Sequence, residues 1–224
     1  DRLIEIGADT AKLHLVRRGI DLSREPATLR PISQPMRILS IGRLVEKKDF
    51  SFQLAVYEAL ISSSFAFTAE IVGHGPLEER LRKEAHRRGL GGRVTFRGRL
   101  NYHNVEKAYR QADIFLFTGR IANNGDRDGL PNVIAEAMTH GLPVLTAPVA
   151  GALEAIEDGR TGFVLPKNSP RAWSDTLRAL PGNPDLDQIR NNASKWIHEN
   201  FDIQKNGSTL CHLLQAHAAP RPPI

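Results

Sequence analysis

Short runs of apolar and β-branched residues recur along the chain, and segments in which apolar residues repeat every three or four positions separate them. A short apolar run between turn residues predicts a buried strand, whereas the longer period predicts an amphipathic helix. On this basis we predict strands at residues 12–16, 37–41, 68–72, 93–96, 114–117, 144–146 and 163–165.

The intervening segments carry helical stripes and helix boundary signals. The stripes are Leu77, Leu81 and Ala85; then Val105, Ala108, Tyr109 and Ala112; then Trp173, Leu177 and Leu180. First helical turns are indicated by Pro76, Pro131 and Pro170, and helix ends by Gly89 and Gly141. Strands that alternate with helices form parallel βαβ units. The predicted fold class is therefore α/β, a Rossmann-like parallel sheet with helices on both faces.

Composition favours a soluble globular protein over a membrane-spanning or disulfide-rich one. Of 224 residues, 41% are hydrophobic and 25% charged, as in ordinary soluble globular proteins. No apolar run approaches about 20 residues, so no transmembrane helix is predicted. The single cysteine, Cys211, excludes an internal disulfide and fits a reducing compartment. The start "DRLIEIGADTAKLH" lacks Met and any signal peptide, so we expect a fragment of a cytoplasmic protein.

The net charge of +5 is compatible with nucleic acid, an anionic membrane surface or a phosphorylated substrate. One local basic cluster, "EERLRKEAHRRG" at 78–89, has acids among its bases, so a solvated helix face is the favoured interpretation. A nucleic-acid binder would need an aromatic, basic stacking platform, which is missing. We therefore expect no nucleic-acid partner.

Ligands of such sheets bind in the loops that follow the carboxyl ends of the strands. In "IGRLVEKKD", Gly42 is followed by Arg43 and Lys48, a combination that suits an anion such as a diphosphate. Alone, this loop is better interpreted as an ordinary basic surface loop. In "IVGHGPLEE", Gly73 and Gly75 flank His74, but the full G-x-G-x-x-G dinucleotide pattern is absent.

The segment "NGDRDGLPNVIAEAMTHGLPVL" holds two acids, Asp128 and Glu136, around a predicted helix start at Pro131. The free amides and dipole of that start attract negative charge. Asp128 alone is better interpreted as a helix cap. Glu136 shares a stripe with Asn132 and His140, where its carboxylate can accept hydrogen bonds from vicinal hydroxyls.

Together these motifs resemble the C-terminal domain of a family 4 retaining glycosyltransferase with the GT-B fold. They occur in that family's order, from about Lys12 to Leu180. The matching segments are "RILSIGRLVEKKD", "AEIVGHGPLEERL", "VTFRGRL", "ADIFLF", "DGLPNVIAEAMTHGLPVL" and "AGALEAIEDGRTGFVLP".

The resemblance implies a nucleotide-diphosphate sugar as donor substrate, with no cofactor and no metal. It implies that Arg43 and Lys48 contact the diphosphate, Asp128 the sugar hydroxyls and Glu136 the ribose. Asp128 stands where the family most often has Glu, which leaves the sugar open. The donor-binding set that it implies is Gly42, Gly73, His74, Gly75, Arg99, Leu100, Gly129, Leu130, Pro131 and Asn132.

The implied reaction is sugar transfer with retention to a glycan or lipid-linked acceptor, in polysaccharide or glycolipid biosynthesis. The expected domains are 1–20, the end of an acceptor domain and its linker strand; 21–182, the donor domain; 183–218, helices that pack on the missing domain; and 219–224, a flexible tail. We expect peripheral contact with the inner face of the membrane through that missing N-terminal domain. The apolar residues of the last helices would then be partly uncovered: Trp196, Ile197, Leu210, Leu213 and Leu214.

Other interpretations use the same residues. Asp126 and Asp128 match the Asp-x-Asp pattern that holds a metal in another glycosyltransferase fold, but so do Asp185 and Asp187, and such short matches are weak. A nucleotide-sugar epimerase or a non-catalytic nucleotide-binding domain of the same fold also remains open. The acid pair with Arg43 and Lys48 favours the transferase.

Overall fold

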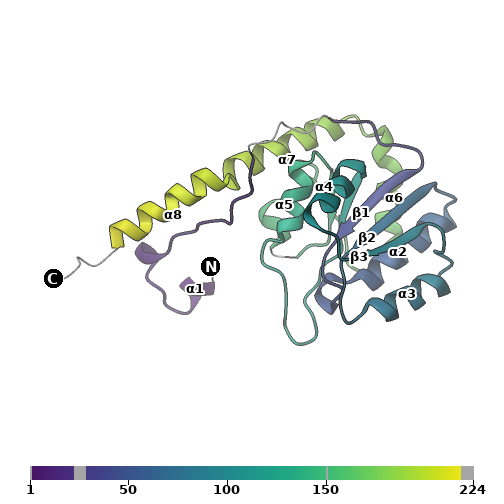
Figure 1. Cartoon of the computed structure of the whole chain (residues 1–224), viewed down its shortest axis with the longest axis horizontal. Coiled ribbons are helices and arrows are strands. Elements are labelled where there is room, and N and C mark those ends of the chain that lie inside the picture. Colours follow the sequence, from purple (N-terminus) through teal and green to yellow (C-terminus); the bar gives the residue numbers. More distant parts are fainter. Residues whose placement is uncertain (1, 23–28, 150, 218–224) are drawn as a thin grey trace. The chain divides into compact units, whose positions relative to one another are not determined.

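The computed structural model describes residues 2–22, 29–149 and 151–217 (Figure 1). Contacts divide the chain into two compact units. The larger unit is Glu25–Ile197, and the smaller joins Asp1–Arg24 to His198–Ile224.

The larger unit is built on one six-stranded parallel sheet in the order β3-β2-β1-β4-β5-β6. The strands are β1 (Met36–Ile41), β2 (Phe67–Val72), β3 (Val94–Gly98), β4 (Ile114–Phe117), β5 (Val144–Thr146) and β6 (Phe163–Val164). The predictions from residue 37 onward are confirmed, two of them to the residue, and so is the α/β class.

Helices follow the strands as the βαβ pattern requires (Figure 1). They are α2 (Phe50–Ser62), α3 (Glu78–Arg87), α4 (Tyr102–Gln111), α5 (Asn132–Thr139), α6 (Pro170–Ala179) and α7 (Leu186–Asn200), with 3-10 turns η2 (Glu46–Lys48), η3 (Ala152–Glu154) and η4 (Leu180–Gly182). Most residues of the predicted stripes are buried, whereas Leu77 and Val105 are half-buried. Gly89 and Gly141 adopt positive φ just beyond α3 and α5, which explains why those helices end there.

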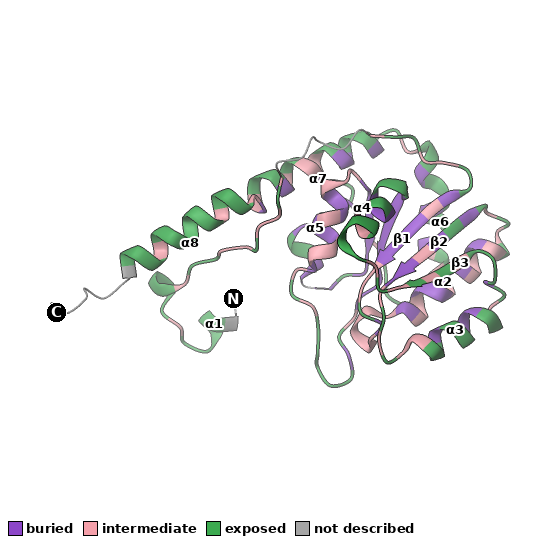
Figure 2. Ribbon diagram, viewed as in Figure 1, coloured by how far each residue is buried: buried purple, intermediate pink, exposed green. Residues whose placement is uncertain are grey.

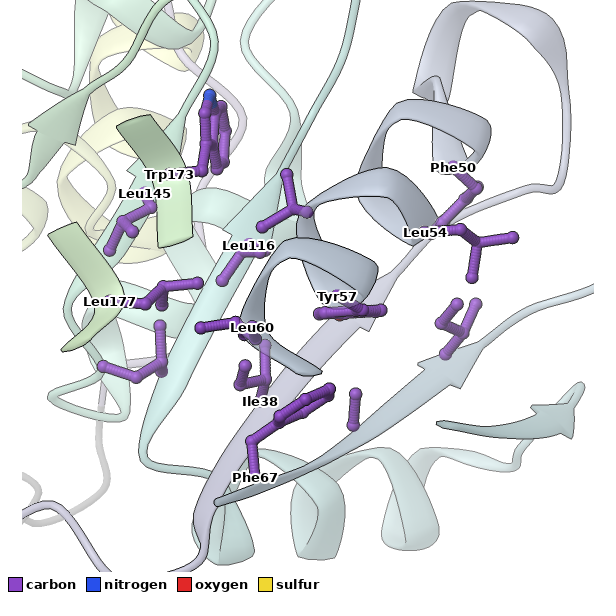
Figure 3. Close-up of a cluster of buried hydrophobic side chains, with 14 of the residues drawn as sticks. Ile38, Phe50, Leu54, Tyr57, Leu60, Phe67, Leu116, Leu145, Trp173 and Leu177 are labelled. Atoms are coloured by element: carbon purple, nitrogen blue, oxygen red, sulfur yellow. The ribbon is translucent and has the colours of Figure 1, made fainter. Parts of the chain in front are cut away.

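The main core lies between one face of the sheet and α2, α3 and α6 (Figure 3). Ile38, Leu116 and Leu145 point from neighbouring strands toward these helices. The preceding residue of β4, Phe115, is also fully buried and packs against Tyr109 of α4. Because successive side chains of a strand alternate between faces, both faces of the sheet are covered by helices.

In the smaller unit, the predicted strand at 12–16 is wrong. Thr10–Lys12 forms a 3-10 turn, η1, and 13–19 has no regular structure. Leu15 is 73% exposed, and among the described residues no strand pairs with this apolar run, so it is not part of a sheet. The unit also holds α1 (Arg2–Glu5) and α8 (Ile203–His217), and a parallel bridge joins Ile20 to Asp202.

The predicted C-terminal helices are confirmed, and α8 is largely exposed (Figure 2). Leu210 and Leu214 are 46% and 63% exposed, whereas Ile197 is fully buried in the larger unit, contrary to expectation. The predicted tail at 219–224 lies outside the described residues. Within the part of the chain that the structure describes, no helix is both long and apolar enough to cross a membrane.

A buried acid fixes the amino end of the central strands. Asp113, just before β4, is 3% exposed and accepts hydrogen bonds from the backbone and the side chain of Arg37, both at 2.8 Å, and from the Ser33 hydroxyl. Burial alone would raise the pKa of Asp113. The hydrogen bonds from Arg37 and Ser33 outweigh that effect and hold its pKa below the ordinary value.

We expect Asp113→Asn to lower the free energy of unfolding at pH 7 by about 1–3 kcal/mol, because charge-assisted hydrogen bonds are lost. A lowered native pKa stabilises the fold above the unfolded-state pKa, and this stabilisation disappears as pH falls through the native value. The difference between wild type and variant should therefore shrink below about pH 4. Urea unfolding at a series of pH values measures it, and a difference independent of pH would contradict this account.

Candidate functional site

Five loops meet at the carboxyl edge of the sheet, because parallel strands all end at the same edge. They follow β1 (42–49), β2 (73–77), β3 (99–101), β4 (118–131) and β5 (147–149 and 151). Every site residue predicted from the sequence lies in one of these loops or in η2 and α5, with Glu136 one turn inside α5.

The loops after β1 and β2 are locked together by backbone contact. Leu44 N donates to His74 O at 3.0 Å, and Leu77 N donates to Leu44 O at 3.1 Å. A Cβ atom on Gly73 would lie 1.9 Å from Gly42 O, and Gly73 has a φ of +133°. These glycines therefore serve the contact between two loops, a role that the sequence motif alone did not indicate.

Lys48 and Asp128, 80 positions apart in sequence, form an ion pair at the centre of the loops. Lys48 Nζ lies 2.8 Å from Asp128 Oδ2, and the two side chains are only 13% and 17% exposed. The same ammonium stands 4.8 Å from the centroid of the Phe117 ring. Arg43, the other predicted cation, is exposed.

Lys47 is a further site residue that the sequence reasoning missed. Its Nζ lies 3.0 Å from Asp126 Oδ1 and 3.6 Å from Asp128 Oδ1. The hydrogen bond to Asp126 raises the pKa of Lys47. Lys47 thus stands between the two acids of the Asp-x-Asp pattern, where a metal ion would have to sit. Among the described residues, no three acidic, His or Cys side chains are grouped as metal ligands would be.

The loop after β3 is joined to the loop after β2. Arg99 Nη2 lies 2.7 Å from His74 Nε2, and Gly73 N donates to Gly98 O at 2.8 Å. Since a guanidinium only donates, His74 Nε2 is the acceptor and the imidazole carries its hydrogen on Nδ1. His74 is therefore hydrogen-bonded to Arg99. Its ring and Arg99 are both exposed on the same side of the site.

The long loop after β4 is tied down on η2. Thr118 Oγ1 donates to the carbonyls of Lys48 and Asp49 at 3.0 and 3.1 Å. Farther along, Arg120 Nη2 and the backbone N–H of Asn123 both donate to Glu46 Oε1, at 2.9 and 3.0 Å. No motif in the sequence singled out Glu46 or Arg120. These contacts fix the position of the loop, in which Asp128 pairs with Lys48.

The start of α5 has no side-chain cap. Its N-cap residue is Pro131, which makes no capping hydrogen bond, and Asp128 pairs with lysines instead. The interpretation of Asp128 as a helix cap is therefore wrong. Ile134 N donates to Pro131 O at 3.0 Å, whereas among the described residues the backbone N–H groups of Asn132 and Val133 make no hydrogen bond. These two N–H groups could donate to an anion.

Glu136 lies on the half-buried side of α5 and accepts a hydrogen bond from the Tyr109 hydroxyl at 2.9 Å. The opposite side buries Ile134, Ala135, Ala137 and Met138 against the sheet. The predicted stripe of Asn132, Glu136 and His140 is half-buried along its length. The carboxylate is therefore held by protein on one side and open on the other.

The basic cluster on α3 stands apart from these loops. Glu78 pairs with Arg82 at 2.8 Å and Glu79 with Lys83 at 2.6 Å, one turn apart along the helix. The prediction of a solvated helix face is confirmed, since the bases of this face are exposed and much of their charge is offset by neighbouring acids.

The parallel sheet with helices on both faces defines the chain as a Rossmann-like α/β domain. The chain belongs to the glycosyl transferases group 1 family, whose model matches residues 24–196.

Two curated relatives come from bacterial polysaccharide pathways. The chain is 30% identical over 218 residues to WcaL of Escherichia coli, a glycosyltransferase provisionally assigned to colanic acid biosynthesis, and the match covers 96% of this chain and 54% of WcaL. It is 32% identical over 187 residues to the amylovoran biosynthesis glycosyltransferase AmsK of Erwinia amylovora, covering 83% and 46%. The chain thus spans about half the length of these relatives.

Solved structures show the same fold at low identity. Anabaena HepE in complex with UDP-glucose superposes with a TM-score of 0.78 at 21% identity, covering 95% of this chain and 60% of HepE. The C-terminal domain of LpcC, a group 1 glycosyl transferase of Francisella tularensis, superposes with a TM-score of 0.68 at 19% identity. That match covers 83% of this chain and 100% of the LpcC domain.

Gly151, in the loop after β5, packs closely against the backbone that precedes α5. A Cβ atom on Gly151 would lie 1.9 Å from Gly129 O, whereas one on Gly129 would meet nothing within 4 Å. We expect Gly151→Ala to lower the free energy of unfolding by about 1–3 kcal/mol, because backbone must move. Gly129→Ala should lower it by less than about 0.5 kcal/mol. Equal denaturation midpoints for the two variants would contradict this packing.

Proposed function

We propose that this chain is the donor-binding, C-terminal half of a family 4 retaining glycosyltransferase that holds a nucleotide-diphosphate sugar at the carboxyl edge of its sheet. The observation that carries the proposal is the Lys48–Asp128 ion pair, whose acid lies three residues before Pro131, the N-cap residue of α5 that no side chain caps. A cation, a hydroxyl acceptor and free amide donors are what a sugar diphosphate needs for recognition.

The diphosphate would lie at the start of α5, beside Lys48 and Arg43. The first-turn amides supply directed donors, and Lys48 is partly desolvated, which strengthens its interaction with an anion. As the sugar–phosphate bond breaks, negative charge grows on the leaving diphosphate. Cations and amides that are already in place stabilise this charge without reorganisation, which is the main contribution of such a site to the rate.

The sugar and the nucleoside would extend from the diphosphate in two directions. Asp128 accepts from sugar hydroxyls and Glu136 from the ribose diol, while Arg99 and Leu100 line the position of the base. Lys47 and Lys48 supply the positive charge that other glycosyltransferases obtain from a metal. We therefore propose a donor site that works without metal and without a cofactor.

The complete protein would add an acceptor domain before this chain, which accounts for the part of each relative that the chain does not cover. Its acceptor is proposed to be a glycan or a lipid-linked glycan, since WcaL and AmsK carry names from polysaccharide biosynthesis. Such a protein would work in the cytoplasm, with the acceptor domain in peripheral contact with the membrane. The exposed leucines of α8 would pack on that domain.

Nucleotide binding tests the donor site. In EDTA, at about 100 times the dissociation constant, the preferred diphosphate among UDP, GDP and ADP should stabilise the fold by about 2.7 kcal/mol. For a chain of this size, that corresponds to a rise of about 5–10 °C in the melting temperature. Lys48→Met should abolish most of the rise, because it removes the half-buried cation while keeping the length of the side chain.

Lys83→Met is the matched control, since it also removes the lysine of an ion pair but on the exposed face of α3. It should leave the rise unchanged. If all three diphosphates fail in EDTA but one succeeds with added magnesium or manganese, the metal-free site is wrong. If none binds under either condition, the donor-site proposal fails.

An assay of sugar transfer tests whether this chain is active without a further domain. The isolated chain should bind the donor yet transfer no sugar to simple or lipid-linked glycan acceptors, because a GT-B enzyme places its acceptor on the other domain. Release of nucleotide diphosphate can be followed in a coupled assay, with a full-length glycosyltransferase as positive control. Turnover on the order of 1 s⁻¹ or faster would show that this chain needs no further domain.

A further inference from the structure

Tyr109, near the end of α4, is held rigidly between two rings. It is 1% exposed, its ring stacks on His140 with a centroid separation of 4.8 Å and an interplanar angle of 17°, and Phe115 of β4 lies 5.9 Å away on centroids. His140 is itself fixed, because its Nδ1 lies 2.7 Å from the backbone carbonyl of Glu136. A side chain packed in this way has one accessible rotamer, so the position of its hydroxyl is determined.

That hydroxyl has a single hydrogen and two acceptors within reach. It lies 2.9 Å from Glu136 Oε2 and 3.3 Å from the carbonyl of Val133. The shorter distance and the negative charge of the carboxylate make Glu136 the stronger acceptor. Burial raises the pKa of Tyr109 well above its ordinary range, and the charge of Glu136 raises it further. The phenol therefore keeps its proton, and with it the hydrogen bond, across the neutral range.

The hydrogen bond acts on one oxygen of Glu136 and leaves the other open. Among the described residues, Oε1 of Glu136 takes part in no hydrogen bond. A glutamate on a helix surface otherwise samples several rotamers, and ordering it on binding costs free energy. With Oε2 held by Tyr109, the carboxylate is oriented before a ligand arrives.

We propose that Tyr109 is a positioning residue that orients the Glu136 carboxylate to accept hydrogen bonds from the ribose diol of the donor nucleotide. This inference rests on the proposed function, because it assumes a nucleotide at the α5 start. Tyr109 touches no part of the ligand and acts through Glu136. In the sequence it is one member of an apolar stripe on α4, and the competing interpretation is that it only fills the core.

The two interpretations differ in what Tyr109→Phe does to ribose recognition. Phenylalanine keeps the ring and its stacking but removes the hydroxyl. UDP, GDP and ADP, and the 2′,3′-dideoxy analogue of each, are titrated calorimetrically into both proteins. For the diphosphate that binds wild type best, Tyr109→Phe should weaken affinity about threefold to tenfold, the size of one lost hydrogen bond. Affinity for its dideoxy analogue should not change, because that analogue has no diol for Glu136 to accept from.

Two further variants complete the design. Tyr57→Phe removes the hydroxyl of another fully buried tyrosine, which is bonded to Gln53 in the main core, and should leave both affinities at wild-type values. In a Glu136→Ala background, adding Tyr109→Phe should cause no additional loss, since the two residues act as one unit.

Equal loss of ribonucleotide and dideoxynucleotide affinity in Tyr109→Phe would overturn the inference in favour of a packing role. Unchanged ribonucleotide affinity, or additive losses in the double variant, would overturn it too and leave the donor site intact. A wild-type chain that binds none of the three diphosphates would overturn the proposed function and this assignment together.

Discussion

The pairing of β1 with β4 is the constraint on which the rest of the site depends. β1 is hydrogen-bonded to β2 on one side and to β4 on the other, so the order of the sheet reverses there. At such a point the loops of adjacent strands lead to opposite faces and a crevice opens between them. Here those loops carry Lys48 and Asp128, and their ion pair joins the two loops.

Two lysines and two acids balance their charges where these loops meet. Lys47 and Lys48 share Asp126 and Asp128, and the pairs are partly shielded from water. Leaving a partly desolvated ion without a partner costs more free energy than leaving an exposed ion unpaired. We therefore expect each lysine to keep its carboxylate partner until another anion takes its place. A diphosphate would replace the carboxylate at Lys48 and leave Asp128 free for hydroxyl groups.

Much of the fold could be predicted from the sequence, because burial on both faces makes a parallel strand a short continuous apolar run. β4 and β5 matched to the residue for this reason. The segment at 12–16 has a similar pattern but no neighbouring strand, and pattern alone cannot supply one. In the candidate site, the loops could be identified from the sequence, but the side-chain contacts between them could not. Nothing local links Lys48 to Asp128, or a tyrosine in an apolar stripe to Glu136, since both contacts arise from strand order.

The amino ends and the carboxyl ends of the strands have different roles. Asp113 and Arg37 fasten β1 and β4 at their amino ends, whereas the loops that would meet a ligand leave from their carboxyl ends. Substitutions in the loops therefore act at a distance from the bonds that hold the strands in order. A scaffold with this division is evolvable, because new sugar or nucleotide preferences can arise by loop replacement while the framework that sets the strand order is inherited unchanged.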